Sequence, residues 1–243
     1  EYIKKNDPRK VAIIGTGFIG LELCESLKHL GMEVLMLERL NQVTPGLDPD
    51  MADHVEKYLK QKGISVITGA NVEKIGDGEV VLSDGRSFKA DMFILAAGIR
   101  PNVEIAREAG VEIGVTGAIA VNSRLETNIE DIYACGDCAE QFHVVTGKPV
   151  LRPLGTTANK TGRIVGENIA GGNTEFRGVL GTGIFRIFDM TVALTGLSER
   201  DAIKEGYDVV TCDNRKLSKT EYMGGKIIII KGIADRKTGR LLG

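Results

Sequence analysis

The chain has 243 residues, of which 42% are hydrophobic, so it is long enough to bury one large or two ordinary cores. Its formal net charge of −2 comes from 31 Lys and Arg against 33 Asp and Glu, which leaves no single-sign field to attract nucleic acid or an anionic membrane. The longest uninterrupted aliphatic run, Ile227 to Ile230, is far shorter than a membrane span, and Glu1 to Lys10 is charged rather than an apolar signal segment. We therefore expect a cytoplasmic protein with a small-molecule substrate, no nucleic acid and no membrane.

The first elements along the chain predict a βαβ unit. Lys10 to Ile14 is a short β-branched run typical of a strand, and the glycine-rich sequence Gly15 to Gly20 follows it at once. Apolar residues then recur at helical spacing, at Ile19, Leu23, Leu27 and Leu30. Gly31 is the glycine expected after a helix C-terminus, and Glu33 to Glu38 indicates a second buried strand.

The rest of this module alternates helix and strand and includes a meander. We expect a helix from about Asp50 to Lys62, a strand at Ile64 to Ile67 and a closing buried strand at Met92 to Gly98. The meander between these strands is indicated by Val72, Val80 to Leu82 and Phe88, with turns at Asp77-Gly78 and Asp84-Gly85.

After Pro101 the sequence changes to glycine-rich loops and shorter elements. We expect short strands at Ile119 to Val121 and Ile132 to Ala134, a helix from about Thr156 to Ala170, and a domain boundary at Gly171 to Asn173. Beyond that boundary we expect strands at Gly183 to Arg186, Met190 to Leu194, Val209-Val210 and Ile227 to Ile230, and a helix at Ser198 to Glu205. The chain stops directly after a strand-like hairpin, which indicates an interrupted domain.

The glycine sequence has the composition of a dinucleotide-binding turn. Gly15 permits the tight turn out of the strand, Gly17 lets the backbone approach a pyrophosphate, and Gly20 allows the helix to pack closely. The phosphates would meet the positive end of the helix. A glycine-rich turn that binds nothing is the alternative, but the complete βαβ context favours NAD binding. The cofactor-binding candidates in this turn are Gly15, Thr16, Gly17, Phe18, Ile19 and Gly20.

Two charged residues at the end of the second strand bear on the choice between NAD and NADP. A carboxylate at Glu38 can accept both hydroxyls of an adenosine ribose and would repel a 2′-phosphate, which favours NADH over NADPH. The neighbouring Arg39 could instead hold a 2′-phosphate. A third possibility is that Glu38 and Arg39 form only a solvated pair.

Three later segments resemble motifs of the pyridine nucleotide-disulfide oxidoreductases. Thr127 to Asp137, TNIEDIYACGD, is similar to the second flavin-contact motif of that family. Phe93 to Asn102, FILAAGIRPN, is similar to the segment that links the NAD-binding domain to the returning FAD domain. Pro153 to Arg163, PLGTTANKTGR, resembles the start of the flavin-facing helix. The motifs occur in the family's order and cover nearly the whole chain.

The resemblance implies an α/β fold in which a Rossmann-like dinucleotide-binding domain, residues 1–98, is inserted in a partial FAD-binding domain, residues 99–172. An incomplete α+β dimerisation domain, residues 173–243, would follow. Gly136 would let FAD approach the backbone, and Asp137 would accept a hydrogen bond from its ribityl chain. The other positions that the resemblance assigns to cofactor binding are Gly98, Thr156, Thr157 and Ala158.

Within the family, the closest resemblance is to the NADH oxidase and coenzyme A-disulfide reductase branch. It rests on Asn159 to Gly172, Gly181 to Asp208, Tyr222 to Gly225 and Gly239 to Gly243, the last two resembling the branch's dimerisation domain. The full-length parent is therefore expected to be a homodimer. The branch uses one redox cysteine near the FAD, in an N-terminal FAD-binding segment that this chain lacks, so no catalytic residue is assigned here.

The cysteines that are present do not indicate a redox or metal centre. Cys135 and Cys138 form a CxxC sequence, which elsewhere marks a redox dithiol or half of a zinc site. The intervening Gly-Asp is already assigned to flavin contact, and no second CxxC or His pair supplies further ligands, so we expect no metal. Cys24, close to Leu23 and Leu27, is expected to be a buried apolar residue.

The implied function is a relay that uses NAD and FAD. Hydride would pass from the reduced nicotinamide to the flavin and on to a thiol, a disulfide or oxygen. These residues do not separate an oxidase from a disulfide or persulfide reductase. The alternative is that the chain by itself is a dinucleotide-binding module without turnover.

Overall fold

The structure is a computed structural model that describes all 243 residues. Contacts between Cα atoms divide the chain into two units. Unit 1 contains Glu1–Gly98 together with Ile184–Ala193, and unit 2 contains Ile99–Gly183 together with Leu194–Gly243. The domain limits expected from the sequence stay predictions, and each unit is described by itself.

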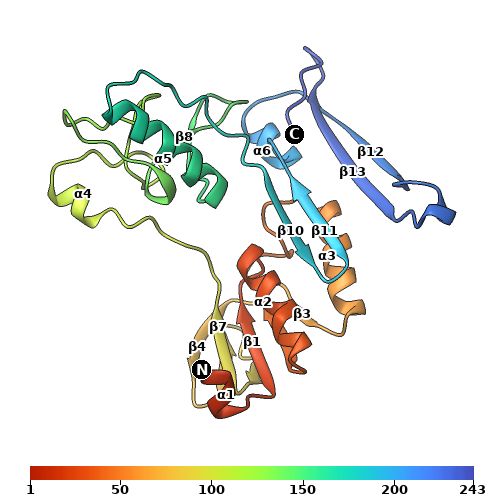
Figure 1. Cartoon of the computed structure of the whole chain (residues 1–243). Helices are drawn as coiled ribbons and strands as arrows, with labels where there is room; N and C mark the ends of the chain where they lie inside the picture. The colour runs from red at the N-terminus through yellow and green to blue at the C-terminus, as the bar shows by residue number, and fades with distance from the viewer. The chain divides into compact units, whose positions relative to one another are not determined.

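A four-stranded parallel sheet in the order β3-β2-β1-β7 is the centre of unit 1 (Figure 1). Its strands are β1 (Lys10–Ile14), β2 (Glu33–Leu37), β3 (Ser65–Ile67) and β7 (Met92–Leu95). Ile14 pairs with Leu37 on one side and with Leu95 on the other, so three strands end at the same level. This edge, where the carboxyl ends of parallel strands meet, is the usual place for a ligand in such a sheet.

Two long helices and a meander complete the expected βαβ module, which is confirmed. The helices are α2 (Phe18–His29) and α3 (Pro49–Gln61), and the meander is β4 (Val72–Gly76), β5 (Glu79–Leu82) and β6 (Ser87–Lys89). The meander packs on the sheet through a buried cluster of Ala12, Leu37, Ala70, Val80, Leu82 and Ala90. A short helix that the sequence did not predict, α1 (Tyr2–Asn6), precedes β1 and ends at Asp7, which has a left-handed φ of 42°.

The hairpin of β10 (Gly183–Ile187) and β11 (Met190–Leu194) confirms both strands expected there. Although this hairpin comes late in the sequence, residues 184–193 belong to unit 1 by their contacts.

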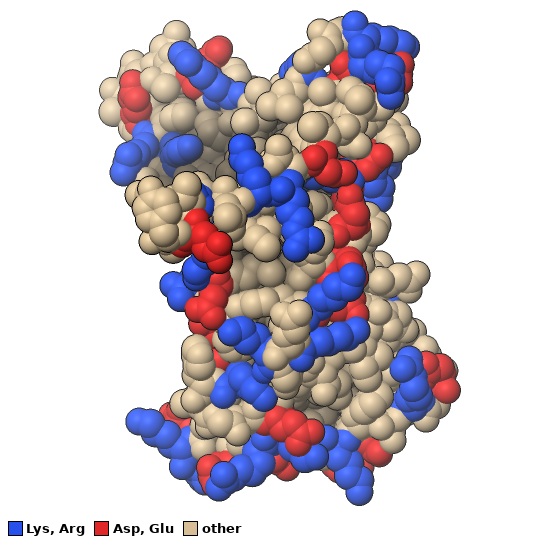
Figure 2. Space-filling view, turned by 90° about the vertical axis from the view of Figure 1, so that its right-hand side faces the viewer, with Lys and Arg blue, Asp and Glu red and all other residues tan.

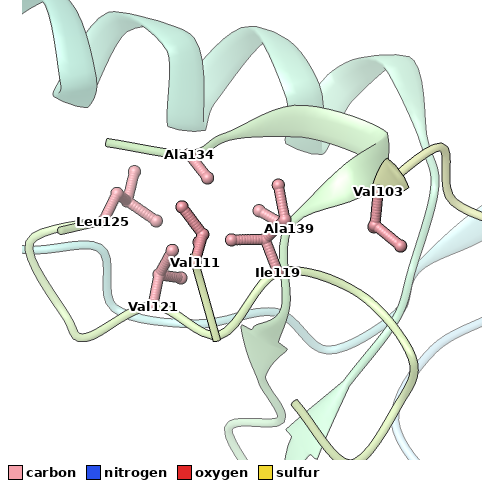
Figure 3. Close-up of a cluster of buried hydrophobic side chains, with 7 residues drawn as sticks. All are labelled: Val103, Val111, Ile119, Val121, Leu125, Ala134 and Ala139. Atoms are coloured by element: carbon pink, nitrogen blue, oxygen red, sulfur yellow. The ribbon is translucent and has the colours of Figure 1, made fainter. Parts of the chain in front are cut away.

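Unit 2 has a core beneath its long helix, α5 (Gly155–Ile169), which confirms the helix expected at this position. Ile164 and Val165 of α5 pack against this core. Its buried residues are Val103, Val111, Ile119, Val121, Leu125, Ala134 and Ala139 (Figure 3). The short elements around it are α4 (Glu104–Glu108), the 3-10 helix η1 (Gly136–Cys138), β8 (Gln141–Phe142) and β9 (Pro149–Val150).

The prediction of strands at Ile119 to Val121 and Ile132 to Ala134 is wrong. The first segment contributes only single bridges from Ile119, and the second contributes one bridge from Tyr133. Leu125 and Asp131 have left-handed φ values of 65° and 62°, and such residues end an extended backbone before a ladder can grow. Ile119, Val121 and Ala134 of these segments instead enter the core from irregular loops, while Ile132 is exposed.

The last part of unit 2 contains α6 (Glu199–Lys204), η2 (Glu221–Met223) and a long antiparallel hairpin. The helix agrees with the expected one, and the Oγ of Ser198 caps it by accepting a hydrogen bond from the Asp201 N–H at 3.1 Å. The hairpin strands, β12 (Val209–Leu217) and β13 (Ile227–Asp235), are longer than predicted because their pairing carries exposed polar residues such as Asp213 and Lys216.

The surface carries both signs of charge. On the face that Figure 2 displays, Lys and Arg are interspersed with Asp and Glu. No helix of the structure is long and apolar enough to cross a membrane.

Candidate functional site

Gly15 and Gly20 build the glycine turn. Gly15 has a φ of 105°, and its N–H donates to the Leu37 carbonyl at 2.8 Å, which ties the end of β1 to the end of β2. A Cβ at Gly15 would collide with the carbonyl oxygen of Ala96, and a Cβ at Gly20 would collide with the carbonyl oxygen of Gly15. These two glycines are therefore required by the close approach of β1, β7 and the first turn of α2.

Gly17 differs because it has open space where a side chain would lie. A Cβ at this position would meet no atom within 4 Å, so its space is open. Gly17 is also the N-cap residue of α2 and provides no side-chain cap, so the first N–H groups of the helix lack a partner from the cap. Phe18 and Ile19 begin the helix, and the Ile19 side chain is 58% exposed. An open helix start at the carboxyl edge of a parallel sheet fits a pyrophosphate.

Glu38 lies beside this turn and is almost fully buried, at 6% exposure. One of its carboxylate oxygens accepts hydrogen bonds from the Thr16 N–H at 3.0 Å and the Thr16 hydroxyl at 2.7 Å. The other accepts from the Leu40 N–H at 2.9 Å. The alternative in which Glu38 and Arg39 form only a solvated pair is therefore wrong. Glu38 is buried and bonded to the glycine turn, while Arg39 is exposed.

The hydroxyl of Thr16 is a contact that sequence reasoning missed. Thr16 was included only as a member of the glycine motif, whereas its side chain links the motif to Glu38. Gly98, the remaining candidate in unit 1, follows β7 with a φ of 108°, is exposed, and has open space where a Cβ would lie.

In unit 2 the expected flavin-contact pair forms the start of η1. Gly136 has a φ of 77°, and its N–H donates to the hydroxyl oxygen of Thr161 on α5 at 3.1 Å. The Thr161 hydroxyl in turn donates to the Thr157 carbonyl at 2.9 Å. Asp137 is exposed. Thr161, only 1% exposed, therefore fastens the Gly-Asp loop to the helix, a role that sequence reasoning missed.

Gln141 is a second positioning residue that the sequence did not reveal. Its side-chain amide donates to the carbonyls of Ala139 at 2.7 Å and Gly136 at 3.3 Å. Its side-chain oxygen accepts from the Arg152 N–H at 2.8 Å. A buried glutamine in a short β-type segment could have been noticed, but the sequence does not show that it links the loop before it to Arg152.

The start of α5 brings the other unit 2 candidates next to this loop. Leu154 is the N-cap residue and offers no side-chain cap, so the helix start is open as in α2. Thr156 is exposed, while Thr157 is buried. The Cβ of Ala158 lies 3.6 Å from where a Cβ of Gly136 would be, an ordinary packing distance, so the loop lies against the helix. The structure thus brings Gly136, Asp137 and the first turn of α5 together.

The four cysteines are free thiols. Cys24 is buried, as expected, and burial raises its pKa to about 12. Burial also raises the pKa of Cys135 above its ordinary value, with the neighbouring Cys138 contributing in the same direction. The raised pKa values of Cys24 and Cys135 favour the thiol over the reactive thiolate. No group of three or more His, Cys, Asp or Glu side chains in the structure could hold a metal ion.

An open pocket of about 520 Å³ in unit 1 lies away from the glycine turn. Its lining residues are Glu1, Tyr2, Ile3, Leu23, Leu27, Asp91, Met92, Phe93 and Ile94. None of the dinucleotide candidates is among them, and the pocket does not contribute to the candidate site.

Two protein-family models match the chain in sequence order. Residues 1–162 match the model described as pyridine nucleotide-disulphide oxidoreductase, and residues 184–243 match the dimerisation domain of the same family.

The similar proteins are about twice as long as this chain. An NAD(P)H sulfur oxidoreductase (CoA-dependent) from Pyrococcus furiosus is 44% identical in an alignment of 253 positions that covers 100% of this chain and 56% of that protein. An NADH oxidase from Methanocaldococcus jannaschii is 41% identical, with coverage of 100% and 55%. The solved structure of an NAD-dependent persulfide reductase from A. fulgidus has a TM-score of 0.96 and 41% identity, over 99% of this chain and 46% of that one.

The fold agrees with the expected class, and the resemblance stated from the motifs is confirmed. The chain spans about half the length of these relatives. With a family model that matches 162 of its 243 residues, the chain belongs to the pyridine nucleotide-disulphide oxidoreductase family.

Proposed function

We propose that this chain is the nicotinamide-binding part of an FAD-dependent NAD(P)H oxidoreductase. The observation that carries the proposal is the open, uncapped start of α2 at Gly17, next to two glycines that the fold itself requires. A Cβ at Gly17 would meet no atom within 4 Å, so a ligand can approach the backbone N–H groups at this helix start closely. The pyrophosphate of NADH fits this space, where backbone N–H groups and the helix dipole favour negative charge.

Glu38 holds the adenosine end of the dinucleotide in this proposal. Its buried carboxylate fixes Thr16 in the glycine turn, and the oxygen that accepts from the Leu40 N–H retains a lone pair for a ribose hydroxyl. The negative charge also repels a 2′-phosphate, so NADH is the preferred reductant. Arg39, exposed beside it, is the residue that would accommodate NADPH.

The loop at Gly136 and the start of α5 hold FAD. The exposed Asp137 carboxylate accepts a hydrogen bond from the ribityl chain, and the open helix start at Gly155 to Thr157 favours negative charge on the ring system. Bound FAD supplies the capacity to take up a hydride and pass on electrons. Thr161 and Gln141 keep the loop in place for that contact.

The electron acceptor we propose is a sulfur compound, such as a coenzyme A-linked persulfide or disulfide. The names of the Pyrococcus furiosus and A. fulgidus proteins support this choice, while the Methanocaldococcus jannaschii name favours oxygen. The match to a dimerisation domain at residues 184–243 supports a homodimer as the working form.

The test of the nicotinamide site is titration of the purified chain with NADH and NADPH. The chain contains no Trp, so the fluorescence of the reduced nicotinamide is followed directly. We expect NADH to bind more tightly than NADPH, Glu38→Ala to narrow the difference, and Arg39→Ala to weaken NADPH alone. Absence of NADH binding would contradict the proposed site, and a preference for NADPH would assign the pocket to Arg39.

The second candidate function is a dinucleotide-binding module without turnover. It is favoured by the location of every NAD candidate in unit 1, while the proposed FAD contacts lie in unit 2. The flavin content of the full-length parent separates the two functions, because both predict that the purified 243-residue chain binds NADH. A colourless parent that binds NADH supports the module, whereas a yellow parent that oxidises NADH with a persulfide supports the enzyme.

A further inference from the structure

The β10–β11 hairpin belongs to one domain by sequence and to another unit by its contacts. Its sequence lies in the segment that matches the dimerisation-domain model, but residues 184–193 belong to unit 1 by their contacts. Along β10 the burial alternates, with Phe185 at 4% and Ile187 at 0% exposure, while Ile184 is 68% exposed. Because successive strand residues point to opposite faces, one face of the hairpin is buried and the other is exposed.

The buried face of the hairpin reaches the glycine turn. The ring of Phe185 packs against the ring of Phe18, with centroids 4.8 Å apart and an interplanar angle of 36°. Phe18 is the first residue of α2 and directly follows Gly17. The contact is therefore made at the helix start whose N–H groups we assign to the pyrophosphate.

The turn of the hairpin is fastened further along the same helix. The Phe188 N–H donates to the Glu25 carboxylate at 2.6 Å, and the Phe188 ring meets the His29 ring edge-on with centroids 5.7 Å apart. Phe188 has a left-handed φ of 48°, which is unfavourable for a bulky residue and persists only where surrounding contacts hold it. The contacts from α2 supply that constraint.

A second helix holds the other residue of the turn. The Asp189 N–H donates to the Tyr58 hydroxyl at 2.9 Å, and the Asp189 carboxylate forms an ion pair with Lys62 at 3.0 Å. Tyr58 lies on α3, and Lys62 is the residue directly after the end of α3. The turn of the hairpin is thus bonded to both α2 and α3. These bonds hold the hairpin in the position in which Phe185 packs against the start of α2.

We propose that the β10–β11 hairpin fixes the first turn of α2 for dinucleotide binding, and that Phe185 is the positioning residue that acts through Phe18. Without this support, Phe18 at the helix start loses its ring contact while the turn before it is still held at Gly15, Thr16 and Gly20, and the open space at Gly17 can then change shape. The inference rests on the proposed NADH site and adds to it a specific element from a distant part of the sequence.

The test compares Phe185→Ala with Ile184→Ala in the full 243-residue chain. The two positions are adjacent on β10 and both changes truncate a large apolar side chain, but Ile184 is exposed and serves as the matched control. We expect Phe185→Ala to weaken NADH binding by about three- to tenfold, from the size of an aromatic pair contact. Ile184→Ala should bind NADH as the wild type does. ADP-ribose, which carries the same pyrophosphate, should lose affinity by the same factor as NADH.

Two further measurements separate positioning from a general loss of stability. Amide exchange of residues 18–21, measured well below the unfolding transition, should accelerate in Phe185→Ala and not in Ile184→Ala. In a double-mutant cycle, adding Phe185→Ala to Phe18→Ala should weaken NADH binding no further, because the effect passes through Phe18.

The outcomes decide the inference. The inference is overturned if Phe185→Ala folds and binds NADH like the wild type. It is also overturned if, in the double-mutant cycle, the losses of NADH affinity caused by Phe18→Ala and Phe185→Ala multiply as independent effects do. If Phe185→Ala does not fold, Phe185→Leu, which keeps most of the volume, replaces it and should still weaken NADH binding measurably; unchanged affinity there also overturns the inference. A wild-type chain that binds no NADH contradicts the proposed function itself, which is a different result.

Discussion

The glycine turn at Gly15–Gly20 and the loop at Gly136–Cys138 both bring a left-handed glycine to the uncapped start of a helix, but different parts of the chain hold them there. In the first, strand, turn and helix follow one another directly. In the second, the loop and helix α5 are separated by β8 and β9. The Gly136 N–H donates to Thr161 of the helix, and Gln141 bonds the loop to the segment just before the helix. The first site is fixed mainly by backbone geometry and the second mainly by side chains.

The comparison predicts its largest effect at Gly15. Gly15→Ala requires an unfavourable φ and a collision with the Ala96 carbonyl, so we expect it to lower the free energy of unfolding by more than about 3 kcal/mol. Gly17→Ala meets no atom and should cost less than about 1 kcal/mol, yet it should weaken NADH binding about tenfold or more by filling the pyrophosphate space. Urea unfolding and NADH titration measure the two effects. Equal stability losses in the two variants would contradict the distinction.

The corresponding change in the second turn is Thr161→Val. It removes the hydroxyl that accepts from Gly136 and leaves a partly buried N–H without its partner, so we expect a loss of about 1–2 kcal/mol in the free energy of unfolding. Thr161→Ser should restore most of it. Thr156→Val, at an exposed position of the same helix, should change stability by less than about 0.5 kcal/mol. If Thr161→Val proves as stable as Thr156→Val, the hydroxyl does not hold the loop.

The two units are expected to respond to different pH ranges. In unit 2, burial and then the nearby Arg152 lower the pKa of His143 below its usual 6.5, against smaller opposite effects of Glu205 and Asp201. The unfolded chain takes up a proton at this histidine more readily than the folded chain does. The stability that neutral His143 contributes is therefore present above about pH 6.5 and is lost as the pH falls through the lower folded pKa.

Asp91 of unit 1 titrates at lower pH. Hydrogen bonds from the Lys10 and Arg9 N–H groups lower its pKa below 3.8, so its contribution is intact above about pH 5 and is lost as the pH falls through that lowered value. Amide exchange resolved by segment, at about pH 7.5 and about pH 5.5, should show protection falling around His143 but not around Asp91. His143→Asn should remove the difference between the two pH values. Equal sensitivity in both units would contradict the assignment.

The smallest effect is predicted at the two cysteines that flank Gly136 and Asp137. Because Cys135 and Cys138 are free and only partly buried, replacing both with Ser should leave stability within about 1 kcal/mol and turnover of the full-length enzyme within about twofold. Flavin content and NADH oxidation are the measurements. Loss of turnover with flavin still bound would make this pair a redox centre and would overturn our interpretation of the CxxC sequence.

Local sequence was sufficient for the βαβ unit and its glycine turn. Strand, turn and helix are contiguous there, and Gly20 is needed by its contact with Gly15 in the same turn, so spacing and residue type carry the information. The same local reasoning failed at Ile119 to Val121, where short apolar segments resemble strands but have no partner strand of matching length. Periodicity records which residues are buried, and it does not record what they pair with.

Only the tertiary structure decided what holds the sites in shape. Nothing in the spacing of Thr16 or Thr161 marks their hydrogen bonds, because their partners are brought to them by the fold. The same holds for Phe185, which is separated from Phe18 by most of the chain and yet packs against its ring. A sequence specifies backbone turns through local sterics, whereas side-chain support depends on which distant segments the folded chain places side by side.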